Sequence, residues 1–462
     1  YLQSDRIAEE VTHLDVALGE TGYPFATTGK PQLTIDHVAH AGDLDLPVAP
    51  GGKFVFGQIT SSLPRYLSAG HLVDIARFKA GQTYKRSEVD DLRRAVLATG
   101  LVSSVVVTPR ETSAPAGDAP GVVALDVKMD KGPRHTISGE IGYDTAEGAR
   151  IAASWEDRNL FPPEGSLKLR GILGTDEQLA GVTVRRSNFL GRDRVLTVDL
   201  YADNANLTAY AARKVAFATT YERLTTLLFQ KPWSWSMGLE VQASDEREGV
   251  PNGVTTGRTF YLTTALPLRA AFDHSDNLLD PRTGWRAALR VSPERSWVHE
   301  VGHSYARIQA DASWYLPVGK QVVLASRARF GSLVGTDINN VAPSRRFYAG
   351  GGGSIRGYGY ELVGPLNALG EPKGGRSLYE FSIEARVNTG WFGGALQLAP
   401  FLDSGNAETG AIPRFTDTRY GAGLGIRYKT GFGPIRLDIG TPLNPRPGDS
   451  RIGVYVALGQ AF

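Results

Sequence analysis

Three kinds of residue pattern are missing from this sequence. It contains no cysteine, which excludes a disulfide framework, a thiolate metal site and a catalytic thiol. No run approaches the roughly eighteen apolar residues that a membrane-spanning helix needs. Neither sign of charge is in excess, since 50 basic side chains stand against 48 acidic ones, so we expect no nucleic-acid partner. If the chain spans a membrane, it must do so as a closed barrel, where backbone groups pair without water.

The composition changes near Gly132-Pro133, which divides the chain into 1–132 and 133–462. All seven tryptophans lie beyond this boundary, at Trp155, Trp233, Trp235, Trp285, Trp297, Trp314 and Trp391. Residues 51–132 read as strand, helix, helix, strand, strand, which predicts a complete small α/β module. Residues 1–50 contain a helix and then a strand-like run from Leu33 to His37, which we interpret as a partial module of the same kind. Because no charged-then-apolar leader precedes Tyr1, we expect a mature or trimmed chain.

Local signals place one helix of the complete module in detail. Ser87 is expected to cap it, with Asp90 three residues further on. Leu92, Val96 and Leu97 supply its apolar stripe, and Gly100 ends it.

From His135 onward, segments of about ten residues alternate apolar with polar or small side chains, and Gly, Pro, Asp and Asn separate them. In the run from Tyr379 to Val387, Glu380, Ser382, Glu384 and Arg386 all fall on the second face. Charges on an inner face suit a hydrated lumen better than a packed sandwich core. The pattern predicts a transmembrane antiparallel β-barrel of about sixteen strands after the α/β modules. The tryptophans are either an interfacial belt or scattered core aromatics.

A glycine run followed by an arginine interrupts this pattern between Gly350 and Tyr358, which reads Gly-Gly-Gly-Gly-Ser-Ile-Arg-Gly-Tyr. Such a run is compatible with a flexible linker or a fusion scar. It lies, however, between strand-like runs of one sheet, so we expect a folded loop that carries Arg356.

Two motifs resemble those of a known group. Ile355-Arg356-Gly357-Tyr358 resembles the Val/Ile-Arg-Gly-Phe/Tyr motif of the loop that folds back into the barrel in the outer-membrane assembly superfamily, which contains BamA, TamA and the two-partner secretion transporters. Phe401 to Gly405 resembles its Phe-x-Asp-x-Gly strand motif. The resemblance implies that the α/β modules are periplasmic POTRA domains and that Asp403 faces the lumen near Arg356. Successive side chains of a strand point to opposite faces, and this alternation, which we call strand parity, also turns Asp403 inward. It turns Glu384 inward as a second carboxylate partner.

The chemistry of arginine gives a reason for this motif. A long loop inside a hydrated lumen loses much chain entropy unless something anchors it. A guanidinium can hold a carboxylate with two parallel hydrogen bonds, which lysine cannot reproduce. The alternative is that Arg356 is one of many solvated loop arginines.

The first and last strands form a candidate seam. The run from Thr136 to Tyr143 supplies Thr136, Ser138, Glu140 and Gly142 to this seam, and the run from Arg451 to Phe462 turns Gly453, Tyr455, Ala457 and Gly459 inward. Gly453 and Gly459 either weaken the last strand or fit a crowded lumen. The final aromatic, Phe462, resembles the recognition signal of outer-membrane proteins. The resemblance implies a lateral gate at this seam, where a client strand adds by β-augmentation.

The resemblance further implies a membrane-protein assembly or translocation factor in the outer membrane of a Gram-negative bacterium, without catalysis, cofactor or metal. Short turns between strands favour the TamA branch. That branch implies a TamB-like inner-membrane-anchored periplasmic partner, autotransporters or other outer-membrane proteins as clients, and contact with outer-membrane lipids. A BamA-like insertase, a two-partner secretion transporter and a passive pore remain alternatives.

One rival motif, His299-Glu300-Val301-Gly302-His303, fits the His-Glu-x-x-His pattern of zinc peptidases. That pattern binds metal only on a helix, where the two histidines lie one turn apart. Because this segment lies between alternating strands, we expect a strand-connecting loop rather than a metal site.

Overall fold

The computed structural model describes residues 4–36, 41–144, 148–223, 231–251, 254, 256–431, 433–458, 460 and 462. Contacts divide the chain into two compact units. The first comprises residues 1–136 with the segments 156–167 and 186–194, and the second comprises 137–155, 168–185 and 195–462. In the described part of the chain, no helix is long and apolar enough to cross a bilayer.

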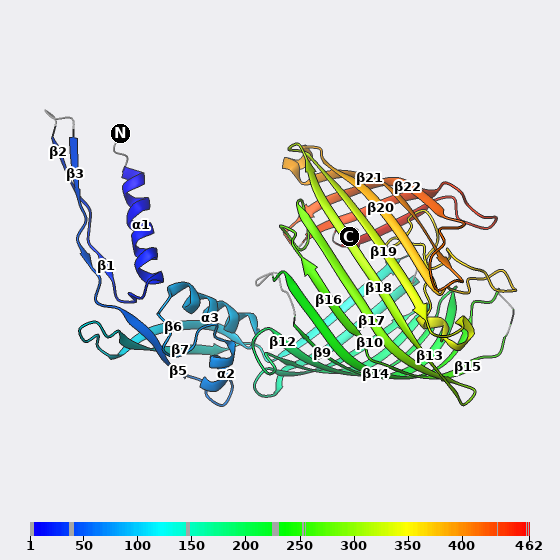
Figure 1. Ribbon diagram of the computed structural model, residues 1–462, viewed down its shortest axis with the longest axis horizontal. Coiled ribbons are helices and arrows are strands. Elements are labelled where there is room, and N and C mark those ends of the chain that lie inside the picture. The colour runs from blue at the N-terminus through cyan, green and yellow to red at the C-terminus, as the bar shows by residue number, and fades with distance from the viewer. Residues whose placement is uncertain are drawn as a thin grey trace. The chain divides into compact units, whose positions relative to one another are not determined.

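Residues 51–132 fold as a three-stranded sheet with two helices (Figure 1). The elements follow the predicted order: β5 (Phe54–Ser61), α2 (Ala69–Ile75), α3 (Arg86–Ala98), β6 (Val102–Ser113) and β7 (Gly121–Lys131). The sheet order is β5-β7-β6, with β5 parallel and β6 antiparallel to β7. Phe56 stacks on Phe78 with ring centroids 3.8 Å apart, and Leu72, Leu92 and Val123 are fully buried beside them. This apolar layer between helices and sheet stabilises the module.

The start of α3 differs from the prediction. Lys85 occupies the N-cap position and makes no side-chain cap bond, while Ser87 lies inside the first turn. Ser87 donates its backbone N–H and its hydroxyl to the two carboxylate oxygens of Glu20, at 2.7 and 2.6 Å. The assignment of Ser87 as the cap is therefore wrong, because Ser87 lies within the helix and its open N–H is bonded by a carboxylate from α1 (Ser4–Glu20). Gly100, with φ of +67°, follows the helix end as predicted.

Residues before β5 form one helix and two short strand pairs. Helix α1 (Ser4–Glu20) is followed by β1 (Thr27–Thr28), β2 (Gln32–Asp36), β3 (Ala41–Asp45) and β4 (Val48–Ala49). Strand β1 pairs with β4 and β2 pairs with β3, both antiparallel. The strand predicted from Leu33 corresponds to β2, and its predicted end, His37, lies outside the described residues.

The remaining strands close into a barrel (Figure 1). They are β8 (His135–Asp144), β9 (Gly148–Phe161), β10 (Gly165–Gly174), β11 (Glu177–Ser187), β12 (Arg194–Asn206), β13 (Tyr210–Arg223), β14 (Trp233–Glu248), β15 (Thr259–Ala265), β16 (Leu268–Asp273), β17 (Gly284–Val298), β18 (Val301–Val318), β19 (Val322–Val334), β20 (Ser377–Asn388), β21 (Leu396–Glu408), β22 (Arg419–Thr430), β23 (Gly433–Pro442) and β24 (Gly453–Leu458). The strands pair in sequence order around the ring, except that β15 and β16 each pair with β14 and β17, and β24 closes the ring beside β8. Closure leaves no free sheet edge.

The barrel has sixteen strand places. Strands β15 and β16 both lie between β14 and β17, so they fill one place as two halves of an interrupted strand. The seventeen strands β8 to β24 minus this one duplication give sixteen. The break falls at Leu266 and Pro267, and proline cannot donate to a ladder. The predicted transmembrane antiparallel barrel of about sixteen strands is confirmed.

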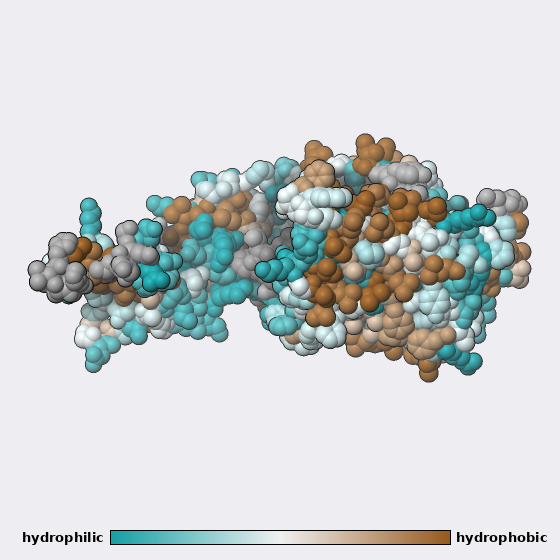
Figure 2. Space-filling view, turned by 90° about the horizontal axis from the view of Figure 1, so that it is seen from above, coloured by the Kyte–Doolittle hydropathy of each residue, from teal (hydrophilic) through white to brown (hydrophobic). Residues whose placement is uncertain are grey.

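Alternating side chains separate a lipid-facing surface from the lumen. On β20, Phe381 and Ile383 are exposed outward while Glu380, Ser382 and Glu384 are buried inside. On β23, Ile435 and Ile439 are exposed and Asp438 is fully buried. Figure 2 shows hydrophobic residues gathered over the barrel strands. This alternation is the dyad pattern from which the barrel was predicted.

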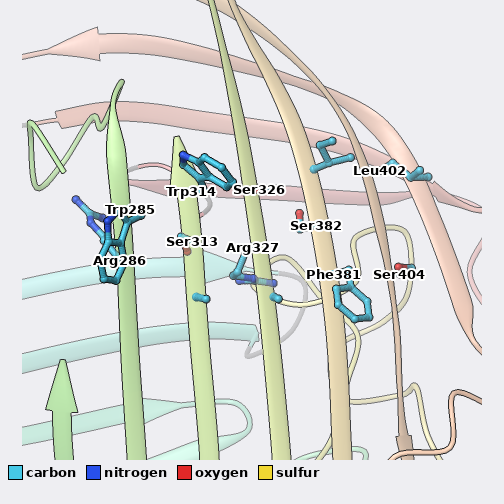
Figure 3. A pocket seen from close by; sticks show the side chains of 13 residues that line it. Trp285, Arg286, Ser313, Trp314, Ser326, Arg327, Phe381, Ser382, Leu402 and Ser404 are labelled. Carbon is cyan, nitrogen blue, oxygen red and sulfur yellow. The ribbon is translucent and has the colours of Figure 1, made fainter. Parts of the chain in front are cut away.

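Four tryptophans belong to the outer surface. Trp233, Trp285, Trp314 and Trp391 are all between 44% and 63% exposed. Trp285 and Trp314 are register partners, and with Phe381 they wall an outward hollow of about 650 Å³ (Figure 3). Trp297, at the other end of β17, is half-buried, with the Arg295 guanidinium 5.2 Å from its ring. Four tryptophans therefore lie on the outer face, as a belt requires, while Trp155, Trp235 and Trp297 are only partly exposed.

Candidate functional site

The loop between β19 and β20, residues 335–376, folds inside the barrel. It contains two short 3-10 helices, η1 (Ile338–Asn340) and η2 (Pro343–Arg345). Isolated bridges join Phe347 to Gly375 and Ala349 to Val363, so the loop has its own backbone pairing. Its apolar residues form one buried cluster with the barrel residues Tyr305, Leu333, Leu378 and Ala407. We call residues 335–376 the lumen loop.

Arg356 binds Asp403 through three hydrogen bonds. Its Nε and Nη2 donate to the two oxygens of the Asp403 carboxylate, at 2.7 and 2.9 Å. Its backbone N–H donates to the same carboxylate at 3.0 Å. The two side chains are 2% and 0% exposed. This is the bidentate pairing that the arginine chemistry favours, in a place shielded from water.

Two further carboxylates reach the same guanidinium. Arg356 Nη1 lies 2.9 Å from Glu384 Oε2 and 3.2 Å from Asp438 Oδ2. The structure thus brings both predicted carboxylates to Arg356 and adds a third, Asp438, for which no partner role was predicted. The three carboxylates come from β21, β20 and β23. We call Arg356 with Asp403, Glu384 and Asp438 the motif anchor.

Other buried arginines balance the charge of the motif anchor. Arg427 Nη2 donates to Glu384 at 2.9 Å, and Arg427 Nη1 also binds Asp438. Arg386 Nε donates to the second oxygen of Glu384 at 3.0 Å. Each carboxylate therefore has at least one cationic partner, which burial of charge requires. Parity had placed Arg386 on the inner face, but no sequence signal selected it or Arg427 as partners.

Close backbone contact explains the glycines around the motif. A Cβ on Gly421 of β22 would lie 1.9 Å from the Arg356 carbonyl oxygen. Gly357 has a φ of +102°, and a Cβ there would lie 2.6 Å from the Thr441 carbonyl carbon. The Phe401 ring then covers the guanidinium at 3.4 Å. The loop backbone can approach the wall only where side chains are absent.

The glycine run before the motif has a fixed conformation. Gly350 N–H donates to the Ser354 hydroxyl at 2.8 Å, and that hydroxyl donates to Glu380. Arg327 Nη1 donates to the Gly353 carbonyl at 3.0 Å. The motif side chains Ile355 and Tyr358 are 0% and 2% exposed. The linker interpretation is therefore wrong, because the segment is bonded to the barrel wall at several points.

A second set of contacts holds the other end of the lumen loop. Ser344 donates its N–H and hydroxyl to Glu246, at 2.9 and 2.8 Å. Arg345 Nη2 lies 2.6 Å from a Glu240 oxygen, and Arg345 Nη1 lies 3.2 Å from both oxygens of Glu294. Arg346 Nη1 donates to Glu248 at 2.6 Å. We call Ser344, Arg345 and Arg346 with these four glutamates the base anchor.

Sequence reasoning missed the base anchor, although a signal for it exists. Glu240, Glu246 and Glu248 are separated by even numbers of residues on β14, so parity puts them on one face. Three consecutive polar residues of a loop, Ser344 to Arg346, could match that face. Only the fold shows that they do.

The first barrel strand carries its predicted seam residues. Thr136, Ser138, Glu140 and Gly142 lie on β8, and Glu140 receives a 2.8 Å bond from Arg150 on β9. The alternate residues Ile137 and Ile141 are 83% and 86% exposed, which places them on the outer face. The seam partner of β8 is β24.

The last strand is shorter than predicted. Strand β24 contains Gly453, Tyr455 and Ala457, ends at Leu458 and pairs with six residues of β23. Gly459 lies outside the described residues. A Cβ on Gly453 would lie 2.3 Å from the Tyr455 hydroxyl, which favours the crowded-lumen explanation for this glycine.

Phe462 does not extend the seam strand. It packs with Tyr315, Val323 and Ala325, and the guanidinium carbons of Arg327 and Arg386 lie 5.4 and 5.5 Å from its ring. Assigning Phe462 to the last strand and its gate is therefore wrong. An apolar cluster and two cations on the inner wall bind the ring instead.

The His-Glu-x-x-His segment is a hairpin turn. His299 and Glu300 connect β17 to β18 with φ of +48° and +68°, while His303 lies within β18. A two-residue turn with positive φ at both positions matches the twist of antiparallel strands. Among the described residues, no group of three or more His, Cys, Asp or Glu side chains could hold a metal ion. The zinc-peptidase alternative fails on this geometry.

Known proteins share this sequence pattern and fold. The Omp85 superfamily domain matches residues 159–462. The outer membrane protein assembly factor BamA of Nitratidesulfovibrio vulgaris is 30% identical over 149 residues, which cover 30% of this chain and 18% of that protein. The chain thus spans under a fifth of this curated relative.

Solved structures show the fold at low sequence identity. BamA from Haemophilus ducreyi lacking POTRA domains 1–3 has a TM-score of 0.79 at 15% identity, over 98% of this chain and 93% of that one. CdiB from Escherichia coli has a TM-score of 0.53 at 13% identity, over 99% of this chain and 84% of that one. The anchored lumen loop, the sixteen-place barrel and the family match together show that this chain belongs to the Omp85 superfamily.

Proposed function

We propose that this protein assembles or translocates client proteins in the outer membrane of a Gram-negative bacterium, with residues 1–132 in the periplasm as POTRA modules. Clients would enter through a lateral gate between β8 and β24. The observation that carries the proposal is the motif anchor beside a terminal strand of six residues, Gly453–Leu458. A strand of six residues has few ladder bonds to break, so we expect the seam between β24 and β8 to open more easily than a seam between two long strands.

The process needs no catalysis, cofactor or metal. A client strand would gain backbone hydrogen bonds at the opened seam, which supply affinity without sequence specificity. Inside the superfamily we favour a TamA-like role, with autotransporters or other barrel proteins as clients, outer-membrane lipids as surroundings and a TamB-like periplasmic partner. Short hairpins such as the turn at His299 and Glu300 support this choice over a BamA-like insertase.

Insertion of a client into liposomes tests the proposal. Wild type, Arg356→Ala and the matched control Arg290→Ala would be compared, with heat-modifiable gel mobility as the folding readout. Arg290 pairs with Asp311 on the barrel wall, outside both anchors. We expect Arg356→Ala to fold and lose most insertion, while the control keeps it. Equal insertion by all three would refute a role for the anchored loop.

The runner-up is a two-partner secretion transporter or passive pore, which the likeness to CdiB favours. Planar-bilayer conductance separates the two functions. A pore conducts steadily and inserts no client, whereas an insertase with its loop anchored conducts little and inserts clients.

A further inference from the structure

One hydroxyl group joins the last barrel strand to the lumen loop. Tyr455 lies on β24 between the exposed Val454 and Val456, so its side chain faces inward. Its hydroxyl accepts a hydrogen bond from the Gly357 N–H at 3.0 Å and donates one to the Tyr358 carbonyl at 2.8 Å. Both partners are backbone groups that directly follow Arg356. The seam strand is thus bonded twice to the segment that the motif anchor holds.

The side chain of Tyr455 fits in a space that exists because two neighbouring residues are glycines. A Cβ on Gly352 of the loop would lie 2.9 Å from the Tyr455 ring, and one on Gly453 would lie 2.3 Å from its hydroxyl. Side chains at either position would push the ring away from the loop backbone. The loop and the strand are both shaped to admit this one tyrosine.

Arg356 itself bonds to other strands. In the described part of the structure, its side chain reaches Glu384 and Ser382 on β20, Asp403 on β21 and Asp438 on β23. The bonds of Tyr455 continue this network to β24. A displacement of the motif backbone therefore reaches the seam strand through the Tyr455 hydroxyl.

We propose that Tyr455 is a positioning residue that keeps β24 closed against β8 for as long as the lumen loop is anchored. Release of the Gly357 and Tyr358 backbone frees β24 to separate from its neighbour. The assignment rests on the proposed function for its purpose, since it names the group that controls the lateral gate. In this assignment, the anchored lumen loop fills the barrel and also holds the seam between β24 and β8 closed.

Hydrogen exchange with mass spectrometry on the full chain in nanodiscs tests this assignment. Tyr455→Phe removes the hydroxyl and keeps the ring in this space. We expect amides of β24 and of the facing β8 to exchange about tenfold faster, the factor for about one net hydrogen bond. Amides of β13 to β19 should keep their wild-type protection. The matched control is Tyr379→Phe, because the Tyr379 hydroxyl bonds to Thr418 and Thr416 and to neither loop nor seam.

A second variant tests whether Tyr455 acts through the anchored motif. Arg356→Lys loses the bidentate geometry, so it should raise β24 exchange although the Arg356 side chain, among the described residues, bonds to β20, β21 and β23. In the double variant, Tyr455→Phe should add less than a twofold further increase. If Tyr455→Phe gives no folded band by heat-modifiable mobility, the β24 exchange of Arg356→Lys decides alone.

The outcomes are distinct. Unchanged β24 exchange in Tyr455→Phe, a rise spread equally over the barrel, or full additivity with Arg356→Lys each overturns the assignment. Exchange needs no client, so it is independent of the insertion assay. Faster β24 exchange with no client insertion by wild type would keep the role of Tyr455 and refute the proposed function. Normal client insertion by wild type, with unchanged β24 exchange in Tyr455→Phe, would keep the proposed function and refute the role of Tyr455.

Discussion

The two anchors of the lumen loop solve one problem in different ways. The motif anchor concentrates three carboxylates from three strands on one side chain, Arg356, and every group in it is at most 2% exposed. The base anchor spreads its contacts over Ser344, Arg345 and Arg346, and its Glu240 and Glu248 side chains are 21% and 28% exposed. Because the motif anchor is shielded from water, each of its bonds is strong, but all of them depend on one residue, Arg356. The base anchor is more exposed to water, so its bonds are weaker, but the loss of one side chain leaves the other bonds in place.

Removing the central arginine is the strongest test of this contrast. Arg356→Ala leaves Asp403, which is fully buried, with only the Ser382 hydroxyl among its described side-chain partners. We expect a loss of about 3–5 kcal/mol in unfolding free energy, measured by urea titration in lipid vesicles. Adding Asp403→Asn should recover part of that loss, because it removes the uncompensated charge. If the double variant is less stable than Arg356→Ala alone, the penalty does not come from buried charge.

The corresponding change in the base anchor should cost less. Arg345→Ala leaves Glu294 with the Tyr305 hydroxyl as a donor at 2.8 Å, and Ser344 and Arg346 keep their own glutamates. We expect a loss of about 2–3 kcal/mol in the same titration. A loss as large as that of Arg356→Ala would contradict the distinction between concentrated and distributed anchors.

Crowding at the wall offers a test that leaves all charges in place. Gly421→Ala puts a methyl group where the Arg356 carbonyl oxygen lies 1.9 Å away, so the motif must shift. We expect about 1–2 kcal/mol of destabilisation and faster exchange at residues 355–358. The control Gly353→Ala meets nothing within 4 Å and should leave both quantities unchanged. Equal behaviour of the two variants would show that the close approach at Gly421 is unimportant.

An exposed arginine–carboxylate pair in the α/β module shows how much the same kind of bond contributes when it is in contact with water. Arg110 binds Asp126 through Nε at 2.7 Å and Nη2 at 3.4 Å, on strands that face solvent. The hydrogen bond from Arg110 lowers the pKa of Asp126, so the stabilisation exists above the unfolded-state pKa and disappears as pH falls through the folded-state value. We expect Arg110→Ala to change module exchange little at pH 7, and by less as the pH falls through the folded-state pKa of Asp126. A large effect at neutral pH would mean that burial does not explain the strength of the motif anchor.

Strand parity explains which parts of the site could be predicted. It fixes the face of each side chain, so Arg356, Asp403 and Glu384 could be expected to meet once the loop was placed inside the barrel. It fixes neither the height of a residue along the barrel nor which distant strands adjoin. Asp438 and the glutamates of β14 were therefore missed, although their faces were readable. Phe462 was misplaced because pattern continuity says nothing about an apolar seat on the inner wall.

The position of the two anchors around the ring gives the lumen loop a mechanical role. Counted from β8 as the first place, with β15 and β16 sharing one, β14 is the seventh and β23 the fifteenth of sixteen. The two strands are thus eight places apart, on opposite sides of the barrel. The loop ties Glu246 on one side to Asp438 on the other, so it acts as a strut across the bore. Any change in the width of the cross-section along that diameter must strain or break charged bonds at one end of the strut.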